Sequence, residues 1–419
     1  VMQRKNEILQ EKLFSIINGG RLKMYLSEKF LSISPSPTLS IDAKFKQMKK
    51  DGLDVVGFGA GEPDFDTPKH IKDAAIKAIL EGKTKYTPAS GMPELKKAVC
   101  QKFMRDNSLY YEPNQIVVSN GAKHSLVNVF GAILNEGDEV IIPAPYWVSY
   151  PEMVKINSGV PVTVYASEDN DFKVTPEQIE EKITEKTRAI VLNSPSNPTG
   201  MVYTKEELEK IAEIALKHSL YIVSDEIYEH LIYEGKHFSI AQISDEVKDI
   251  TIIVNGVSKT YAMTGWRIGY TASNPTIAKV MSNVQSHATS NPNTIAQIAA
   301  IEALNGPQEE LGAMVAEFAK RRNYMADRIN KIEGVSCIKP HGSFYIMMNI
   351  KNILGKKLNG KTIHSADEFA EMLLDDKLVA VVPGTGFEAP DYVRWSYATS
   401  MENIKEGLDR LEKFLSELE

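Results

Sequence analysis

The sequence predicts an α/β protein with a mainly parallel sheet, and two observations carry this prediction. First, from about residue 70 to residue 300, short apolar segments rich in β-branched residues alternate with longer amphipathic segments. Alternating strands and helices of this kind are typical of a parallel sheet covered by helices on both faces. Second, the pattern changes after residue 305, where a long helix and strands of a second sheet are expected. We therefore expect a large α/β domain and a smaller α+β domain.

The elements of the middle region follow one another along the chain. The segment "IKDAAIKAILEG" predicts a helix that ends near Gly82, and "NQIVVSNGAKHSLVNVFGAIL" predicts a strand, a turn and a helix. A strand over "DEVIIPAPYW" is followed by a helix that begins at "TPEQIEEKI", with Thr175 as its cap. The strand "RAIVL" ends in the turn "NSPSNPTG", whose prolines and glycine stop any regular element. A capped helix over "TKEELEKIAEIALKH" and two strands, "LYIVSDEIY" and "TIIVNGVSK", complete the pattern.

The C-terminal region predicts a long helix over "PQEELGAMVAEFAKRRNYMADRINKI", which bridges two domains, and strands over "GSFYIMMNI" and "YVRWSYAT". An amphipathic helix, "MENIKEGLDRLEKFLSEL", closes the chain. We expect residues 24–64 and 305–419 to form the small domain and residues 65–304 the large one. A length of 419 residues agrees with two domains.

Residues 1–23 alternate charged and apolar residues and lack the apolar core of a signal peptide. They predict either a short amphipathic helix or an extension that is not native. Residues Gly19, Gly20 and Arg21 have codons compatible with a purine-rich ribosome-binding sequence just upstream of Met24. We therefore expect natural translation to start at Met24, which N-terminal sequencing of the native protein would test.

Composition excludes several classes of function. The net charge of −7 argues against non-specific binding of nucleic acid and against a polybasic membrane anchor. The sequence contains no run of 18 apolar residues, so we expect no transmembrane helix. Two cysteines, Cys100 and Cys337, give neither a disulfide framework nor a four-ligand zinc site. These features favour a cytoplasmic protein without a membrane or nucleic-acid partner.

Polar side chains gather where the predicted strands end, which is where open α/β sheets bind ligands. The residues concerned are Ser119, Asn120, Gly121, Ala122, Lys123, Tyr146, Trp147, Asn193, Asn197, Asp225, Tyr228, Ser258, Lys259 and Arg267. Buried polar groups without partners cost about 1–3 kcal/mol each, so such a collection indicates a ligand. Pyridoxal 5'-phosphate needs this whole set: a lysine for its aldehyde, an acid for its pyridine nitrogen, a phenol, a stacking aromatic and an anion-binding helix N-terminus.

Nine stretches in order resemble the class I aminotransferases of fold type I, and within them the bacterial-type beta subgroup of aspartate aminotransferases. They are "AGEPDFDTP", "GKTKYTPASG", "SNGAKHSL", "PYWVSYPEM", "NSPSNPTG", "SDEIYEHL", "VSKTYAMTGWRIGY", "SNPNTIAQ" and "VRWSYATS". Each stretch alone is a weak signal, whereas all nine at consistent spacing are very specific. The resemblance covers residues 28–417 and implies a pyridoxal-phosphate-dependent transferase with a large mainly parallel domain and a smaller α+β domain.

The resemblance also implies roles toward the cofactor ring. It implies that Lys259 links covalently to the aldehyde and later moves a proton, and that Asp225 pairs with the pyridine nitrogen. It assigns Tyr228 and Asn197 to the ring oxygen and Trp147 to stacking on the ring. Because lysine, aspartate and tryptophan also occur as surface, capping and core residues, these roles depend on the motifs and not on the residue types alone.

For the phosphate the resemblance implies Gly121, Ala122, Ser258 and Arg267. Tyr86 resembles a residue that reaches the phosphate from the neighbouring subunit, so a homodimer with shared active sites is implied. The alternative for Tyr86 is an ordinary surface tyrosine.

For the substrate the resemblance implies that Arg394 binds the α-carboxylate, assisted by Asn197, Trp147 and the backbone at Gly61. One subgroup binds a distal carboxylate with a partner-subunit arginine before its "SNP" motif, but Ser286 stands there in this chain. Lys123 matches the lysine that replaces this arginine in the beta subgroup. The alternative is that Lys123 only supports the phosphate turn.

We therefore expect an aminotransferase that moves the amino group of L-aspartate to 2-oxoglutarate by a ping-pong mechanism. The same lysine also suits prephenate, so a prephenate or aromatic aminotransferase is an alternative, as is a β-lyase with the same cofactor. A non-enzymatic regulator is disfavoured because residues 1–23 are too short for a DNA-binding domain. His124 is expected to be a hydrogen-bonded helix residue, and His230 and His237 give no reason to propose a metal.

Overall fold

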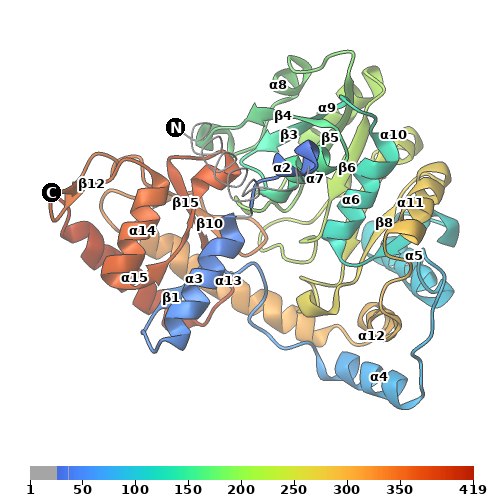
Figure 1. The fold of residues 1–419 in the computed structure, drawn as a ribbon, viewed down its shortest axis with the longest axis horizontal. Helices are drawn as coiled ribbons and strands as arrows, with labels where there is room; N and C mark the ends of the chain where they lie inside the picture. Colours follow the sequence, from blue (N-terminus) through green and yellow to red (C-terminus); the bar gives the residue numbers. More distant parts are fainter. Residues whose placement is uncertain (1–25, 36) are drawn as a thin grey trace, which may run out of the picture. The chain divides into compact units, whose positions relative to one another are not determined.

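The computed structural model describes residues 26–35 and 37–419, which divide into two compact units at residue 35. In the first unit the described residues form one short helix, α2 (Glu28–Leu31). The prediction for residues 1–23, including the start at Met24, lies outside the described residues. All other elements belong to the second unit (Figure 1).

A seven-stranded sheet with the order β2-β8-β7-β6-β5-β3-β4 forms the centre of the second unit. Pairs β3·β4, β3·β5, β5·β6 and β6·β7 are parallel, and β8 runs antiparallel to both of its neighbours. The strands are β2 (Ile116–Ser119), β3 (Glu139–Ala144), β4 (Val160–Tyr165), β5 (Thr187–Asn193), β6 (Tyr221–Asp225), β7 (Thr251–Gly256) and β8 (Gly269–Ala272). The predicted mainly parallel sheet is confirmed.

Helices cover both faces of this sheet because each buried strand carries apolar side chains on both sides. Along β5, Ala189 and Val191 pack in one hydrophobic cluster with α6, α7 and α11, whereas Ile190 and Leu192 pack in another with α8 and α9. A third cluster joins α4, α5 and α12 to β2 and β8. These helices are α4 (Lys69–Leu80), α5 (Pro93–Asn107), α6 (Ala122–Ile133), α7 (Ser149–Ile156), α8 (Pro176–Glu180), α9 (Lys205–Lys217), α10 (Asp245–Ile250), α11 (Pro275–Ala288) and α12 (Thr294–Asn305).

Local sequence explains where several of these helices begin. Thr204 accepts a hydrogen bond from the backbone N–H of Glu207, whose side chain returns to the backbone of Thr204, and Thr175 and Gln178 form the same capping box before α8. Gly82 follows α4 with a φ of +70°, a conformation that glycine adopts without strain. The predicted helices over residues 71–82, 175–183 and 204–218 are therefore present, with small differences at their ends.

A second sheet has the order β14-β15-β10-β9, and all its pairs are antiparallel. The long helix α13 contacts this sheet at β9. It begins shortly after α12 and leads to α15, against which it packs (Figure 1). The elements are β9 (Ser336–Cys337), β10 (Tyr345–Asn349), β14 (Val382–Pro383), β15 (Tyr392–Ser396), α13 (Glu309–Ile329), α14 (Ala366–Lys377) and α15 (Met401–Ser416), with the short hairpin β11 (Lys357–Leu358) and β12 (Lys361–Thr362). The predicted strands and both predicted helices of this region are present.

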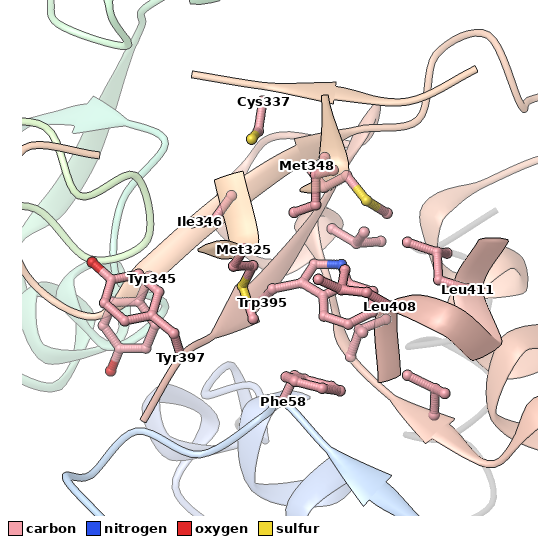
Figure 2. Packing of buried hydrophobic residues seen from close by; sticks show 14 of the residues in the cluster. Phe58, Met325, Cys337, Tyr345, Ile346, Met348, Trp395, Tyr397, Leu408 and Leu411 are labelled. Atoms are coloured by element: carbon pink, nitrogen blue, oxygen red, sulfur yellow. The ribbon is translucent and has the colours of Figure 1, made fainter. Parts of the chain in front are cut away.

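The N-terminal part of the second unit packs into the same region. Helix α3 (Pro37–Lys50) precedes β1 (Val56–Gly57), which pairs in parallel with β13 (Val379–Ala380). Phe58 lies against Trp395 with ring centroids 4.5 Å apart, inside a cluster that also contains Met325 and Leu408 (Figure 2). This packing fixes the backbone at residues 59–61 beside β15. The division into domains at residues 64 and 304 stays a prediction.

Candidate active site

The ends of the central strands meet at one edge of the large sheet. In the sheet register Ser119 pairs with Gly269, Gly269 pairs with Gly256, and Asn193 pairs with Asp225. The carboxyl ends of β2, β5, β6 and β7 and the amino end of β8 therefore lie along the same edge. This is the place where an α/β sheet binds ligands.

A cavity of about 450 Å³ lies at this edge. Of the thirteen site residues expected from the sequence, all except Gly121 and Tyr86 line it: Gly61, Ala122, Lys123, Trp147, Asn197, Asp225, Tyr228, Ser258, Lys259, Arg267 and Arg394. Gly59, Ala60 and Tyr345 are among the other residues that line it. Residues that are more than 300 positions apart in the chain, such as Gly61 and Arg394, thus line the same cavity.

Lys259 follows β7 and points into the cavity, where its Nζ donates a hydrogen bond to the backbone carbonyl of Gly61. Burial lowers the pKa of Lys259 to about 8; Arg267 and Arg394 add to this effect, and Glu62 and Asp225 oppose it. A lysine with this pKa gives up its proton far more readily than a surface lysine. Such a side chain is suited to act as a nucleophile and as a base near neutral pH.

Asp225 ends β6 and is 3% exposed. Its Oδ2 accepts a hydrogen bond of 2.7 Å from the hydroxyl of Tyr150, and its Oδ1 accepts one of 3.2 Å from the backbone N–H of Ile227. Burial raises the pKa of Asp225 to about 6, while these two hydrogen bonds oppose the shift. The carboxyl group is therefore ionised above this pH and is held by two donors.

Arg394 lies in β15 and is 2% exposed. One terminal nitrogen donates to Oδ1 of Asn197 and the other to the carbonyl of Gly59, each at 3.0 Å. Its Nε is buried and has no hydrogen-bond partner within the part of the chain that the structure describes. A buried guanidinium that still has an unpaired donor is suited to receive a planar anion such as a carboxylate.

The turn at residues 193–200 positions Asn197. The side-chain oxygen of Asn193 accepts a hydrogen bond of 2.8 Å from the backbone N–H of Asn197, and the side-chain nitrogen of Asn193 donates to the carbonyl of Asp225 at 3.0 Å. The turn therefore places the amide of Asn197 between Arg394 and the end of β6.

The turn after β2 forms an anion-binding site at the N-terminus of α6. Gly121 has a φ of +89°, and a Cβ atom at this position would lie 2.4 Å from the guanidinium of Arg267. The turn thus brings Arg267 against the free backbone N–H groups of the first helical turn, an arrangement that favours phosphate binding.

His124 accepts a hydrogen bond of 3.2 Å from the backbone N–H of Asn120 at its Nδ1, as expected of a hydrogen-bonded helix residue.

Trp147 and Lys123 lie side by side in the cavity wall. The Lys123 Nζ lies 4.8 Å from the centroid of the Trp147 ring. Burial lowers the pKa of Lys123, and the nearby charge of Arg267 lowers it further. Ser286, where one subgroup has an arginine, donates its hydroxyl to the carbonyl of Asn283 on α11. Tyr86 is 90% exposed, so its expected role depends on a second copy of the chain.

Two tyrosines that the sequence did not single out also line the cavity. Tyr150 contacts Asp225, and the hydroxyl of Tyr345 lies 3.2 Å from that of Tyr228. The Tyr345 ring centroid is 4.4 Å from the guanidinium carbon of Arg394. Tyr150 stands in the motif "PYWVSYPEM" and Tyr345 in a predicted strand, where a phenol is indistinguishable from an ordinary core residue.

A second buried cluster is formed by residues of the loop that follows β6, the loop that also carries Tyr228. Ligand atoms of Glu226, Glu229 and His237 lie within 4.8 Å of one another. All carboxylate oxygens of this cluster accept hydrogen bonds, from the side chains of Ser224, Ser239, His237, Asn107 and Asn255, and Lys102 forms an ion pair with Glu229. The carboxylates of the cluster are thus satisfied within the protein, while Nδ1 of His237 is buried without a hydrogen-bond partner among the described residues; we assign no metal to the cluster.

Comparison with known proteins decides the family. The sequence profile described as "Aminotransferase class I and II" matches residues 53–411. The chain belongs to this family. Class I and II aminotransferases are enzymes that use pyridoxal 5'-phosphate, so the expected fold class, enzyme class and cofactor are confirmed.

Individual relatives agree with this family. The chain is 53% identical over 395 residues to an aspartate aminotransferase of Bacillus sp. (strain YM-2). The matched region covers 94% of this chain and all of the relative. It is 47% identical to a probable aspartate/prephenate aminotransferase of Aquifex aeolicus, over 94% of this chain and 99% of that one. The crystal structure of the aspartate aminotransferase from Rhizobium meliloti superposes with a TM-score of 0.91 at 44% identity, over 94% of this chain and 100% of that one.

The cavity of this aminotransferase fits the cofactor of its family. The turn at Gly121 leaves room for the guanidinium of Arg267 where a Cβ atom would clash, so this cation can lie at the N-terminus of α6. Lys259 supplies an amine with a lowered pKa, and Asp225 supplies a buried carboxyl group.

In the described residues no helix combines the length and the apolar character that crossing a membrane requires.

Proposed function

We infer that this protein is an aspartate aminotransferase, which transfers the amino group of L-aspartate to 2-oxoglutarate. The observation that carries the inference is that one cavity is lined by the lysine and carboxylate suited to the cofactor and by the cations Arg267, Arg394, Lys123 and Lys46. With Arg267 assigned to the phosphate turn, we assign Arg394 and Lys123 to the substrate. Two cations are what a substrate with two carboxylates requires. The names of the relatives described above support the same substrate class.

Each residue has a part in this reaction. Arg394 binds the α-carboxylate through its Nε–H and through the second N–H of a terminal nitrogen, and Asn197 keeps the guanidinium in place. Lys123 binds the distal carboxylate. The bound cofactor supplies an electron sink for the electron pair left when the Cα–H bond breaks. The neutral amine of Lys259 accepts that proton at its Nζ and later returns it, and Asp225 holds a charged ring nitrogen.

The remaining residues hold the cofactor. We propose that Ala122, Ser258 and Arg267 bind the phosphate, with the turn at Gly121 between them. Tyr228 donates to the ring oxygen with Asn197, and Trp147 stacks on the ring and excludes water from the reacting carbon. The backbone at Gly61 assists in binding the substrate.

We further propose a homodimer in which Tyr86 reaches the phosphate site of the partner. The apolar side chains of Ile76, Ile79 and Leu80 on α4 are exposed close in sequence to Tyr86, which supports a covered surface there. Light scattering in solution tests this, and a monomeric active enzyme would contradict it.

A cytoplasmic location is supported by the two free, buried or half-buried cysteines and is tested by cell fractionation.

The experiment that tests the proposed reaction is the absorption spectrum of the purified protein, recorded before and after L-aspartate is added. We expect a band of the bound cofactor that shifts to shorter wavelength with L-aspartate and returns with 2-oxoglutarate, because the amino group moves onto the cofactor and off again. A band that does not respond to aspartate but responds to an aromatic amino acid would move the substrate to the prephenate or aromatic class. Release of ammonia would instead indicate a β-lyase.

Lys123→Ala is expected to reduce kcat/KM for aspartate about 10–100-fold, because a charged hydrogen bond to the distal carboxylate contributes about 1.5–3 kcal/mol. With alanine or phenylalanine, which have no distal carboxylate, the loss is expected to be much smaller. Steady-state kinetics with the three amino acids measure this, and Lys123→Arg is the control that retains a cation. Equal losses with all three substrates would mean that Lys123 only supports the phosphate turn.

A further inference from the structure

Tyr150 is a buried side chain that contacts the carboxyl group of Asp225. It lies in the first turn of α7 and is 2% exposed. Its hydroxyl donates to Oδ2 of Asp225 at 2.7 Å, so it acts at the carboxyl group assigned above to the cofactor ring nitrogen. Neither the sequence motifs nor the comparisons assign this tyrosine a role.

The turn that carries Tyr150 also carries Trp147. The backbone N–H of Tyr150 donates to the carbonyl of Trp147 at 3.0 Å, and the two rings meet edge to face with centroids 5.4 Å apart. One turn after β3 therefore places both the stacking ring and the donor to Asp225. The position of the phenol is fixed by packing in the cluster beneath this turn and not by solvent.

We propose that Tyr150 is a positioning residue, which keeps the carboxylate of Asp225 ionised and aimed at the ring nitrogen of the cofactor. A buried carboxylate with one backbone donor alone would be poorly stabilised. The hydroxyl of Tyr150 supplies the second donor on the other oxygen, so both oxygens are oriented. This inference rests on the proposed role of Asp225 and is independent of the amino acid that the enzyme accepts.

Three titratable groups act on Asp225, and Asp225 acts on a fourth. Tyr150 reaches it from α7, Glu226 from its own loop, and Lys259 from the segment after β7; Tyr228 lies near enough for Asp225 to raise the pKa of its phenol. Burial and the charge of Asp225 hold the pKa of Tyr150 well above its usual value, so the phenol stays a donor over the whole working range of pH. Loss of this donor is expected to raise the pKa of Asp225, because the ionised form loses its stabilisation.

Binding of two ligands to the full chain freed of cofactor tests the proposal. One ligand is pyridoxal phosphate, and the other is its 1-deaza analogue, in which a C–H group replaces the ring nitrogen. In Tyr150→Phe we expect the affinity for pyridoxal phosphate to fall about 10-fold or more and the affinity for the analogue to stay unchanged. Quenching of tryptophan fluorescence measures both affinities.

The pH profile of the same binding gives the second measurement. In the wild type the affinity for pyridoxal phosphate is expected to fall as the pH drops through about 6, where Asp225 becomes protonated. In Tyr150→Phe this midpoint is expected at least about one pH unit higher. Tyr203→Phe is the matched control, because Tyr203 is a buried phenol that accepts a hydrogen bond from the backbone of Val174 and does not contact Asp225.

Two results would overturn the proposal. Equal losses of affinity for both ligands would show that Tyr150 only supports the packing, and an unchanged midpoint would show that it does not act on Asp225. If Tyr150→Phe does not fold, 3-fluorotyrosine at position 150 keeps the shape with a more acidic phenol, and the midpoint is then expected at lower pH. The proposed aminotransferase reaction fails separately, if the wild type shows no response to any amino donor.

Discussion

Lys259→Ala is expected to lower the turnover number at least about 10³-fold, because it removes both the covalent attachment and the group that moves the Cα proton. Cofactor affinity is expected to change little, since the phosphate site at Gly121 and Arg267 and the carboxyl group of Asp225 remain. Single-turnover kinetics with L-aspartate, followed in the visible spectrum, measure the loss. Equilibrium dialysis measures the retained cofactor.

Lys69→Ala is a suitable control, because the side chain of Lys69 is 81% exposed and forms an ion pair with Asp73 on the same helix, far in sequence from the cavity residues. Activity close to that of the wild type in Lys259→Ala would refute the assignment of the active site. Loss of the cofactor along with the activity would show that the covalent link, and not the phosphate site, holds the cofactor.

Arg394→Ala is expected to reduce kcat/KM about 10²–10⁴-fold, because two charged hydrogen bonds to the α-carboxylate contribute about 1.5–3 kcal/mol each. Unlike the effect of Lys123→Ala, this loss is expected with every amino acid, since all of them carry the α-carboxylate. Kinetics with aspartate, alanine and phenylalanine distinguish the two. A loss confined to aspartate would exchange the roles of Arg394 and Lys123.

Arg394→Lys provides the matched variant, because it keeps the charge and loses the two-pronged geometry. We expect it to recover only a part of the loss. Since Arg394 also donates to Asn197 and Gly59, thermal unfolding of both variants separates damage to the fold from damage to substrate binding.

The strands of the large sheet were predictable because they are buried on both faces and form short, continuous apolar runs. Two strands that the sequence analysis did not identify show the limits of this signal. β4 lies at the edge of the sheet, contains Pro161 and has Val164 as its one fully buried residue, and β8 is a four-residue strand that begins at Gly269. Neither has the composition of a buried parallel strand, so their places are set by tertiary pairing.

Most residues of the candidate site were predictable because they stand directly after strands that share one sheet edge. Tyr150 and Tyr345 were not, because their importance lies in hydrogen bonds to residues 75 and 117 positions away. A phenol in an apolar context predicts core packing, and both side chains do belong to hydrophobic clusters. Their polar contacts are a property of the assembled fold.

The pairing of distant segments at Arg394 and Gly59 has a consequence for synthesis of the chain. These two residues are 335 positions apart, and β1 pairs with β13 across a similar separation. At about 5–20 residues per second, the ribosome needs roughly 20–70 s to make the intervening chain. During that time the segment around Phe58 lacks the C-terminal residues against which it packs, so its apolar side chains are buried only after the last part of the chain has been made.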